Sequence, residues 1–263
     1  MNFPEHIPEH YQALLRQLVG ELVEIPGVAA VVLGGSYASR TQRRDSDVDI
    51  GLYYLAEAPF DITRIRRVAE SIADRPPTVT GFYEWGAWVN GGAWIHTAAG
   101  KVDFLYRNLN QIERAIENAQ IGIVEHDYDQ QPTHGFFSVI YLAETEICVP
   151  LYDPQLHIAR LKQMVKPYPQ KLKEKVIADS LWSAEFTLLH ASSFAKSGDV
   201  YNTVGCLTRA SSNLTQALFA LNERYFLNDK WVMKTLAGFA LLPKDYLQQL
   251  THILAHPGET AAE

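Results

Sequence analysis

The sequence predicts an α/β (α+β) domain with a mixed sheet in residues 1–160, followed by an all-helical C-terminal domain in residues 171–263. Three observations lead to this prediction. Strand-like and helix-like apolar patterns alternate in the first part of the chain, whereas only helical spacing remains after a proline-containing segment at 161–170. With 263 residues, of which 47% are hydrophobic, the chain is long enough to form two modest cores.

The first domain is expected to open with an amphipathic helix. Leucine and valine recur at helical spacing from Pro8 to Glu24, and Pro26 with Gly27 ends the pattern. The β-branched run at 28–33 then predicts a buried strand that leads into a tight turn. A short helix is expected at 37–41.

The rest of the chain follows the same division into a mixed part and a helical part. The first domain continues with a helix at 61–73, a hairpin formed by 93–97 and 102–106, a helix at 109–118, and extended segments at 135–142 and 147–152. Two prolines close together predict a linker at 161–170. Helices are then expected at 171–196, 201–222, 231–239 and 245–255.

Composition narrows the class of protein. The formal charge of −7 argues against a broad nucleic-acid surface, which needs a net basic face, and fits a small or cationic partner. No apolar stretch approaches the roughly 18 residues of a membrane span, and the first residues lack the apolar run of a secretory signal, so a cytoplasmic protein is expected. Cys148 and Cys206 show no CxxC spacing, which favours free thiols over a disulfide framework.

Asp47 and Asp49 are the first candidates for chemistry. They flank Val48 at the start of a predicted strand in which apolar residues alternate with aspartate and glycine. Residues two apart on a strand project from the same face, roughly 6 to 7 Å apart, so the two carboxylates stand side by side. Such carboxylates repel each other unless a cation neutralises them, and Mg²⁺ favours carboxylates together with substrate phosphates. The pair therefore predicts a metal site.

A third acid is available on a later strand. Asp103, in the segment KVDFLY, lies on the opposite strand face from its apolar neighbours. If this strand lies beside the strand of Asp47 and Asp49, three carboxylates converge. They could then hold two metal ions about 3.5 to 4 Å apart.

The turn at 34–36 offers the complementary donors. Gly35 gives backbone N–H groups room to approach a phosphate, and the Ser36 hydroxyl and a helix N-terminus add further donors. Arg40 and Arg44 follow the turn, where they either contact a polyphosphate or remain solvated.

Together, these features carry a family resemblance. The segment GGSYASRTQRRDSDVDIG resembles the signature of the DNA polymerase β-like nucleotidyltransferase superfamily, a Gly-Ser turn followed after a short spacer by Asp-x-Asp, with a third acid on a later strand. The matching positions here are Gly35, Ser36, Asp47, Asp49 and Asp103. The signature covers only the first domain, and a mixed domain followed by a helical one is similar to the small-molecule, aminoglycoside-type nucleotidyltransferases.

The resemblance implies a two-metal nucleotidyl transfer. One Mg²⁺, held by Asp47, Asp49 and Asp103, would bring an acceptor hydroxyl to the α-phosphorus of a nucleoside triphosphate; a second, held by Asp47 and Asp49, would stabilise the leaving pyrophosphate. The implied partners are ATP or another nucleoside triphosphate and a small hydroxylated acceptor, for which an aminoglycoside-like cation is the first candidate. The chain contains no GxxxxGK[ST] motif, which argues against γ-phosphoryl transfer.

Other residues are candidates for further roles. Trp85, Trp88 and Trp94 lie among glycines and either stack on a base, line an acceptor pocket, or pack a hairpin. The resemblance implies a lysine from the helical domain at the triphosphate, for which Lys230 is the candidate, with a solvated lysine as the alternative. Glu185 lies in an otherwise apolar helix, where a carboxylate is costly unless it faces a cleft, so it is the candidate for an acceptor-side base.

Two other functions remain open. The same chemistry could act on tRNA or protein, as nucleotidyltransferase toxins do, and a basic surface stripe would favour this interpretation. The fold could also serve as a non-catalytic nucleotide-binding module, although three intact acids argue against that. The oligomeric state is not predicted.

Overall fold

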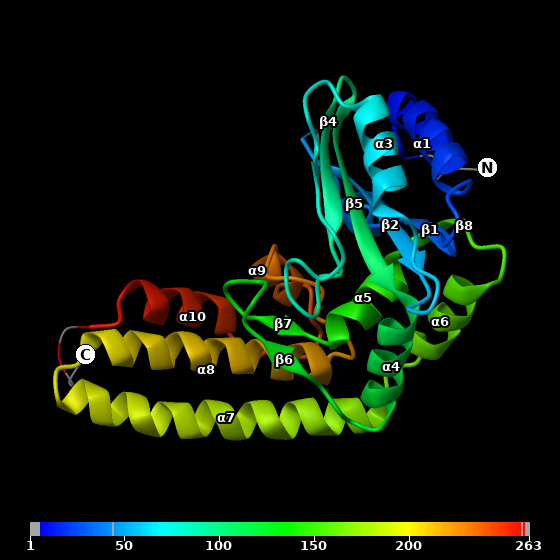
Figure 1. Cartoon of the computed structure of the whole chain (residues 1–263). Helices are drawn as coiled ribbons and strands as arrows, with labels where there is room; N and C mark the ends of the chain where they lie inside the picture. Colours follow the sequence, from blue (N-terminus) through cyan, green and yellow to red (C-terminus); the bar gives the residue numbers. More distant parts are fainter. Residues whose placement is uncertain (1–5, 44, 259, 261–263) are drawn as a thin grey trace. The chain divides into compact units, whose positions relative to one another are not determined.

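The computed structural model describes residues 6–43, 45–258 and 260, and the chain forms two compact units (Figure 1). Unit 1 comprises the described residues up to Ile116 together with Tyr141–Pro167. Unit 2 comprises Glu117–Ile140 and the described residues from Tyr168 onward.

Unit 1 is built around a mixed sheet. Its elements are α1 (Glu9–Leu22), β1 (Ala30–Leu33), α2 (Gly35–Ser39), β2 (Val48–Tyr54), α3 (Ile62–Ile72), β3 (Thr78–Val79), β4 (Gly92–Thr97), β5 (Gly100–Asn108), β8 (Val149–Tyr152), α6 (His157–Val165), and most of α4 (Leu109–Gln120) and α5 (Val139–Ile147). The strand order is β3-β4-β5-β2-β1-β8, and β2 with β5 is a parallel pair, whereas the other neighbours are antiparallel. The predicted mixed sheet is therefore confirmed.

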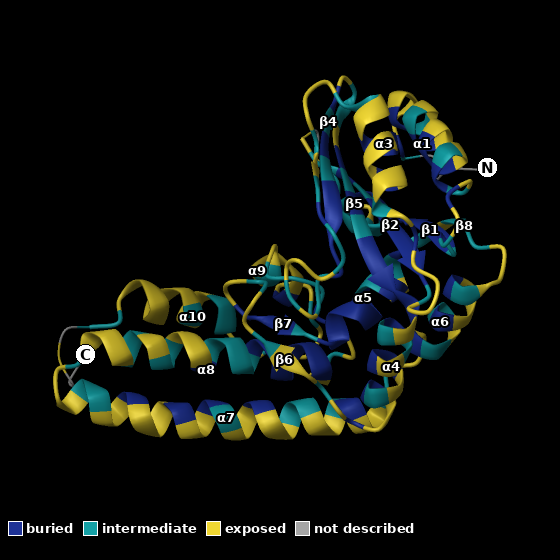
Figure 2. Cartoon of the chain, in the orientation of Figure 1, coloured by how far each residue is buried: buried dark blue, intermediate teal, exposed yellow. Residues whose placement is uncertain are grey.

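The core of unit 1 lies on one face of this sheet. The apolar stripes of α1 and α3 pack on the alternate residues of β2 and β5 that point inward (Figure 1). These strands are largely dark blue in Figure 2, while the outer side of α3 is exposed. Among the fully buried residues of this core are Leu15, Leu18, Leu22, Ile50, Leu52, Ile65, Val102, Phe104 and Tyr106. On the opposite face, Tyr53 of β2 is also buried, whereas Asp49 and Asp103 are partly exposed.

Unit 2 is mainly helical. Its helices are α7 (Gln170–Lys196), α8 (Val200–Leu221), α9 (Val232–Leu236) and α10 (Tyr246–Ala255). The unit also contains a short hairpin of β6 (His126–Asp127) and β7 (Phe136–Phe137). The long helices α7 and α8 pack along each other. Asp199 begins α8, because its carboxylate accepts a hydrogen bond from the Asn202 backbone N–H at 3.0 Å. The predicted helical C-terminal region is confirmed.

The expected extended segment at 135–142 is wrong for most of its length. Only Phe136–Phe137 is a strand, and α5 begins at Val139. A short, continuous apolar run does not distinguish a buried strand from a helix that is buried on all sides. The segment 138–143 is of the second kind, since every residue in it is buried.

The domain boundary also differs from the single linker that was expected at 161–170. The helix α6 extends to Val165, with Ile158 and Leu161 buried at helical spacing, and α7 starts at Gln170. In addition, Glu117–Ile140 belongs to unit 2, since His134 and Phe137 pack on α8 and on Phe226. The assignment of nucleotidyl transfer to the first of the two domains stays a prediction.

Within the described residues, no helix combines the length and the apolarity that crossing a membrane requires.

His134 is expected to make the stability of unit 2 sensitive to acid. Its side chain is 8% exposed and Nδ1 lies 2.9 Å from the Ser212 hydroxyl. Burial lowers the pKa of His134 from its ordinary value of 6.5, and the Asp229 charge opposes this shift. The pKa of His134 is lower in the folded chain than in the unfolded chain, where it is about 6.5. The stabilisation from neutral His134 is therefore fully present above about pH 6.5, and it is lost as the pH falls from about 6.5 through the lower, folded pKa.

We expect the melting temperature to fall between pH 8 and pH 5.5, and to fall less in His134→Asn. Thermal unfolding followed by circular dichroism at several pH values measures this difference. His190→Asn, which changes an exposed histidine of α7, is the matched control and should keep the wild-type slope. Equal slopes in wild type and His134→Asn would refute the assignment.

Candidate active site

The parallel pairing of β2 and β5 brings two of the predicted acids together. Asp49 is the direct register partner of Asp103, and neighbouring strands lie about 4.8 Å apart. Both residues lie on the sheet face opposite the core and are partly exposed. Asp47 lies just before β2, two residues from Asp49.

The turn after β1 lies directly against Asp49. The Gly34 backbone N–H donates to the Asp49 carbonyl at 2.8 Å. Gly35 has φ +55°, and a Cβ at this position would lie 1.7 Å from Asp49 Oδ2. Only glycine therefore fits between the turn and the carboxylate, and Ser36 follows it on the same turn.

Gly35→Ala tests this contact. The added methyl group must displace the Asp49 carboxylate, and a left-handed backbone costs a non-glycine residue about 1 to 2 kcal/mol. We expect a lower melting temperature and a loss of any activity that depends on Asp49. Gly20→Ala on α1, where a Cβ meets nothing within 4 Å, is the control and should be neutral or stabilising. A Gly35→Ala protein with unchanged stability and activity would contradict the packing argument.

Asp47 has a neighbour that the motif did not indicate. Lys101 Nζ lies 4.0 Å from Asp47 Oδ1, with the two side chains 56% and 38% exposed. Lys101 lies two residues before Asp103 on β5, and this same-face spacing is the signal that could have identified it. Burial, and then the charge of Asp47, raise the pKa of the Tyr11 hydroxyl.

The acids suit a hard divalent cation in kind, since all three offer carboxylate oxygens and Asp49 is in register with Asp103. In the described part of the chain, no three His, Cys, Asp or Glu side chains are already arranged as a metal site. Lys101 offers the Asp47 carboxylate a counter-charge, and an exposed ion pair of this kind contributes at most about 1 kcal/mol to stability.

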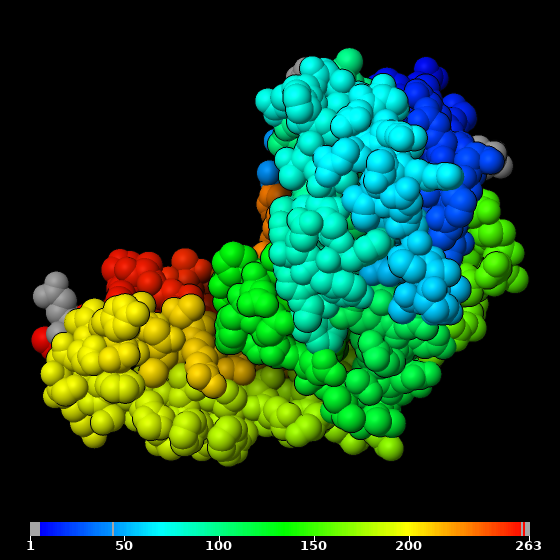
Figure 3. All heavy atoms as spheres, in the orientation of Figure 1, coloured from blue at the N-terminus to red at the C-terminus, as the bar shows by residue number. Residues whose placement is uncertain are grey.

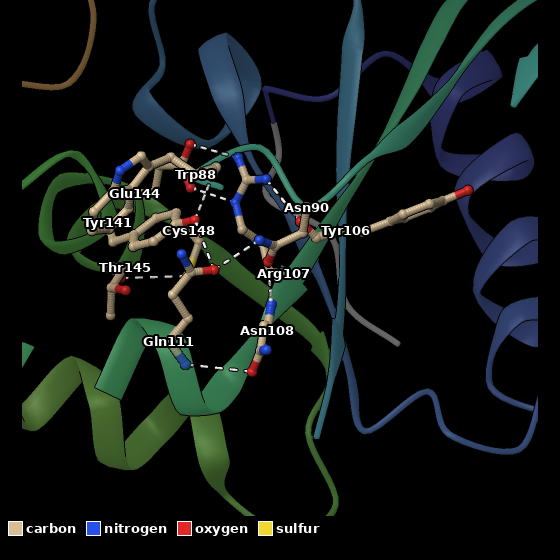
Figure 4. Close-up of polar contacts among 10 residues, drawn as sticks. All are labelled: Trp88, Asn90, Tyr106, Arg107, Asn108, Gln111, Tyr141, Glu144, Thr145 and Cys148. Carbon is tan, nitrogen blue, oxygen red and sulfur yellow. Dashed lines mark hydrogen bonds and ion pairs between the residues drawn. The ribbon is translucent and has the colours of Figure 1, made fainter. Parts of the chain in front are cut away.

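Further along the same sheet face lies a buried ion pair (Figure 4). Arg107 on β5 donates to both carboxylate oxygens of Glu144 on α5, with Nε to Oε2 at 2.7 Å and Nη2 to Oε1 at 2.8 Å. Burial by itself would lower the pKa of Arg107, but Glu144 reverses this and holds the guanidinium charged. The pair joins α5 to the strand that carries Asp103.

The other predicted residues are placed as follows. Arg40 is exposed and follows α2 with a left-handed backbone. It therefore lies close in sequence to the Gly35 turn, but it is not on β2 or β5, the strands that carry Asp49 and Asp103. Arg44 lies outside the described residues. Lys230 and Glu185 belong to unit 2, whereas the acids belong to unit 1.

Glu185 and Lys230 differ in part from expectation. Lys230 is exposed and precedes α9 instead of lying on it. Glu185 is exposed on α7, at an open groove of about 480 Å³ that Leu181, Leu189 and Leu214 also line. The desolvation argument for Glu185 is therefore wrong, because an exposed carboxylate needs no partner. Their roles stay predictions.

A protein-family match covers the part of the chain that contains the Gly35 turn, Asp47 and Asp49. Residues 15–86 match the family described as the nucleotidyltransferase domain, and residues 139–232 match a domain of unknown function (DUF4037). The first match contains the turn and the Asp-x-Asp motif but ends before Asp103. It supports nucleotidyl transfer in general and leaves the aminoglycoside-type resemblance unconfirmed.

Among solved structures, the chain is similar to a nucleotidyltransferase-like protein from Exiguobacterium sibiricum 255-15. The identity is 13%, the TM-score is 0.45, and the match covers 93% of this chain and 71% of that one. No curated protein matches the chain.

Proposed function

We propose that this protein is a Mg²⁺-dependent nucleotidyltransferase that moves a nucleoside monophosphate, AMP from ATP in the first instance, to a hydroxyl group of a small molecule. The observation that carries the proposal is the register of Asp49 with Asp103 beside the Gly35 turn. The carboxylates on β2 and β5 can bind metal ions, and the backbone N–H groups of the turn after β1 can bind phosphates next to them.

Asp47, Asp49 and Asp103 are the residues that would hold two Mg²⁺ ions. When bound, the ions make an acceptor hydroxyl more acidic and neutralise charge on the phosphates. The backbone N–H groups of the turn and the Ser36 hydroxyl would bind the β- and γ-phosphates. Arg40, Arg44 and Lys230 stay candidates for further phosphate contacts.

At the α-phosphorus, the reaction forms one bond and breaks one. The acceptor oxygen bonds to the α-phosphorus, the bond from the α-phosphorus to the bridging oxygen breaks, and pyrophosphate leaves with the electron pair. The hydroxyl proton passes to a base, for which Glu185 stays the candidate. A cationic acceptor, such as an aminoglycoside-like molecule, fits the net charge of −7.

The test is pyrophosphate release from each of the four nucleoside triphosphates, with pooled aminoglycosides and other hydroxylated small molecules, with Mg²⁺ or with excess chelator. Release that needs both Mg²⁺ and an acceptor pool is the expected result. Release that occurs only with added tRNA or protein would move the acceptor to a macromolecule. Nucleotide binding without release in any mixture would instead support a non-catalytic module.

A further inference from the structure

A pair of stacked tryptophans lies next to the acids on the same sheet face. Trp94 on β4 is the register partner of Asp103 on β5, and directly opposed residues of an antiparallel pair project from the same face. Trp85 stacks on Trp94 with ring centroids 4.0 Å apart and planes inclined by 24°. Trp85 remains 39% exposed, so the tryptophan pair presents indole surface beside Asp103.

The segment that carries Trp85 is held in place by hydrogen bonds to two of its carbonyl groups. Tyr141 donates its hydroxyl hydrogen to the Trp88 carbonyl at 2.5 Å (Figure 4). Gln111 Nε2 donates to the Ala87 carbonyl at 2.8 Å. The segment forms part of the surface of unit 1, in the teal region of Figure 3. A surface that is ordered in advance binds a ligand without a further ordering cost.

The strand order gives the tryptophan pair a definite position relative to the acids. From β1 across to β4, the sheet presents the Gly35 turn, Asp49, Asp103 and Trp94 in that order. In a nucleotidyl transfer the attacking and leaving oxygens lie roughly in line on opposite sides of the phosphorus. If the turn takes the leaving pyrophosphate, the attacking hydroxyl comes from the side of Trp94.

We infer that Trp85 and Trp94 form the acceptor subsite, an inference that rests on the proposed function. The acceptor is a hydroxylated ring compound that lies flat against the indole surface and directs a hydroxyl towards Asp103. An indole face binds apolar ring faces and cations. Glu84, which precedes Trp85 and is exposed, adds negative charge next to this surface, so the ring is neutral or cationic.

The kinetic test uses the full chain with Mg²⁺, ATP and a panel of monosaccharides, aminocyclitols and aminoglycosides. For each member that supports pyrophosphate release, we expect Trp85→Ala to raise the acceptor KM about tenfold, the scale of one lost aromatic stacking contact, with an unchanged KM for ATP. Trp85→Phe should restore most of the affinity. Trp182→Ala, which removes a 65% exposed tryptophan of α7, should match wild type. An unchanged acceptor KM in Trp85→Ala would overturn the inference.

A binding test separates this inference from the proposed function. With ¹⁵N-labelled protein, Mg²⁺ and a non-hydrolysable ATP analogue, we expect members of the same panel to shift the indole N–H signals of Trp85 and Trp94. If the analogue binds but no member shifts these signals, the acceptor subsite is wrong and the nucleotide site stands. If the analogue does not bind and no mixture releases pyrophosphate, the proposed function itself is wrong.

Discussion

Replacing Asp49 by asparagine is expected to remove nucleotidyl transfer while leaving the fold intact. Asp49→Asn keeps the size of the side chain beside Gly35 but removes the charge that a metal ion needs. Loss of one preorganised charged group at a reacting centre costs about 100- to 1,000-fold in kcat, and loss of a metal-ligand charge should reach at least that range. Pyrophosphate release under saturating substrate measures the effect.

Asp45→Asn is the matched control for Asp49→Asn. It makes the same chemical change at an exposed loop position four residues earlier, so activity should stay within about twofold of wild type, as for most surface substitutions. Both variants should retain the wild-type circular dichroism spectrum and melting temperature. Near-normal turnover in a folded Asp49→Asn protein would exclude Asp49 as a metal ligand.

Glu144→Ala is expected to cause the largest loss of stability among the substitutions considered. It leaves the Arg107 side chain, which is 9% exposed, without its carboxylate partner. Removing one partner of a buried ion pair costs about 3 to 5 kcal/mol, and the 26% exposure of the Glu144 side chain favours the lower end. Urea denaturation followed by circular dichroism measures the free energy of unfolding.

The control for Glu144→Ala uses a second bidentate pair of unit 1. Glu113 accepts from Arg160, but these side chains are 32% and 50% exposed. Glu113→Ala should therefore cost less than about 1 kcal/mol. The double variant Arg107→Met with Glu144→Leu should recover much of the lost stability, because apolar side chains can replace a buried pair. Similar costs for Glu144→Ala and Glu113→Ala would show that burial does not set the value of the Arg107 pair.

Local patterns in the sequence were sufficient for most elements. The helical spacing at 8–24 and 61–73 predicted α1 and α3, and the period-2 alternation after Asp47 predicted β2, because both periods follow from backbone geometry alone. The apolar run at 138–143 was ambiguous for the opposite reason. A segment that is buried on all sides shows no periodicity, so α5 could not be distinguished from a strand.

The sequence by itself determined the identity of the candidate groups: a Gly-Ser turn, Asp-x-Asp on a strand, and a later strand with Asp103 on its polar face. These features depend on residues that are near one another in the chain. Tertiary structure alone decided that β5 lies parallel to β2 with Asp103 opposite Asp49, that Gly35 leaves room for the Asp49 carboxylate, and that Trp85 stacks beside the site. Strand pairing and side-chain contacts join residues that are far apart in sequence, so no local pattern encodes them.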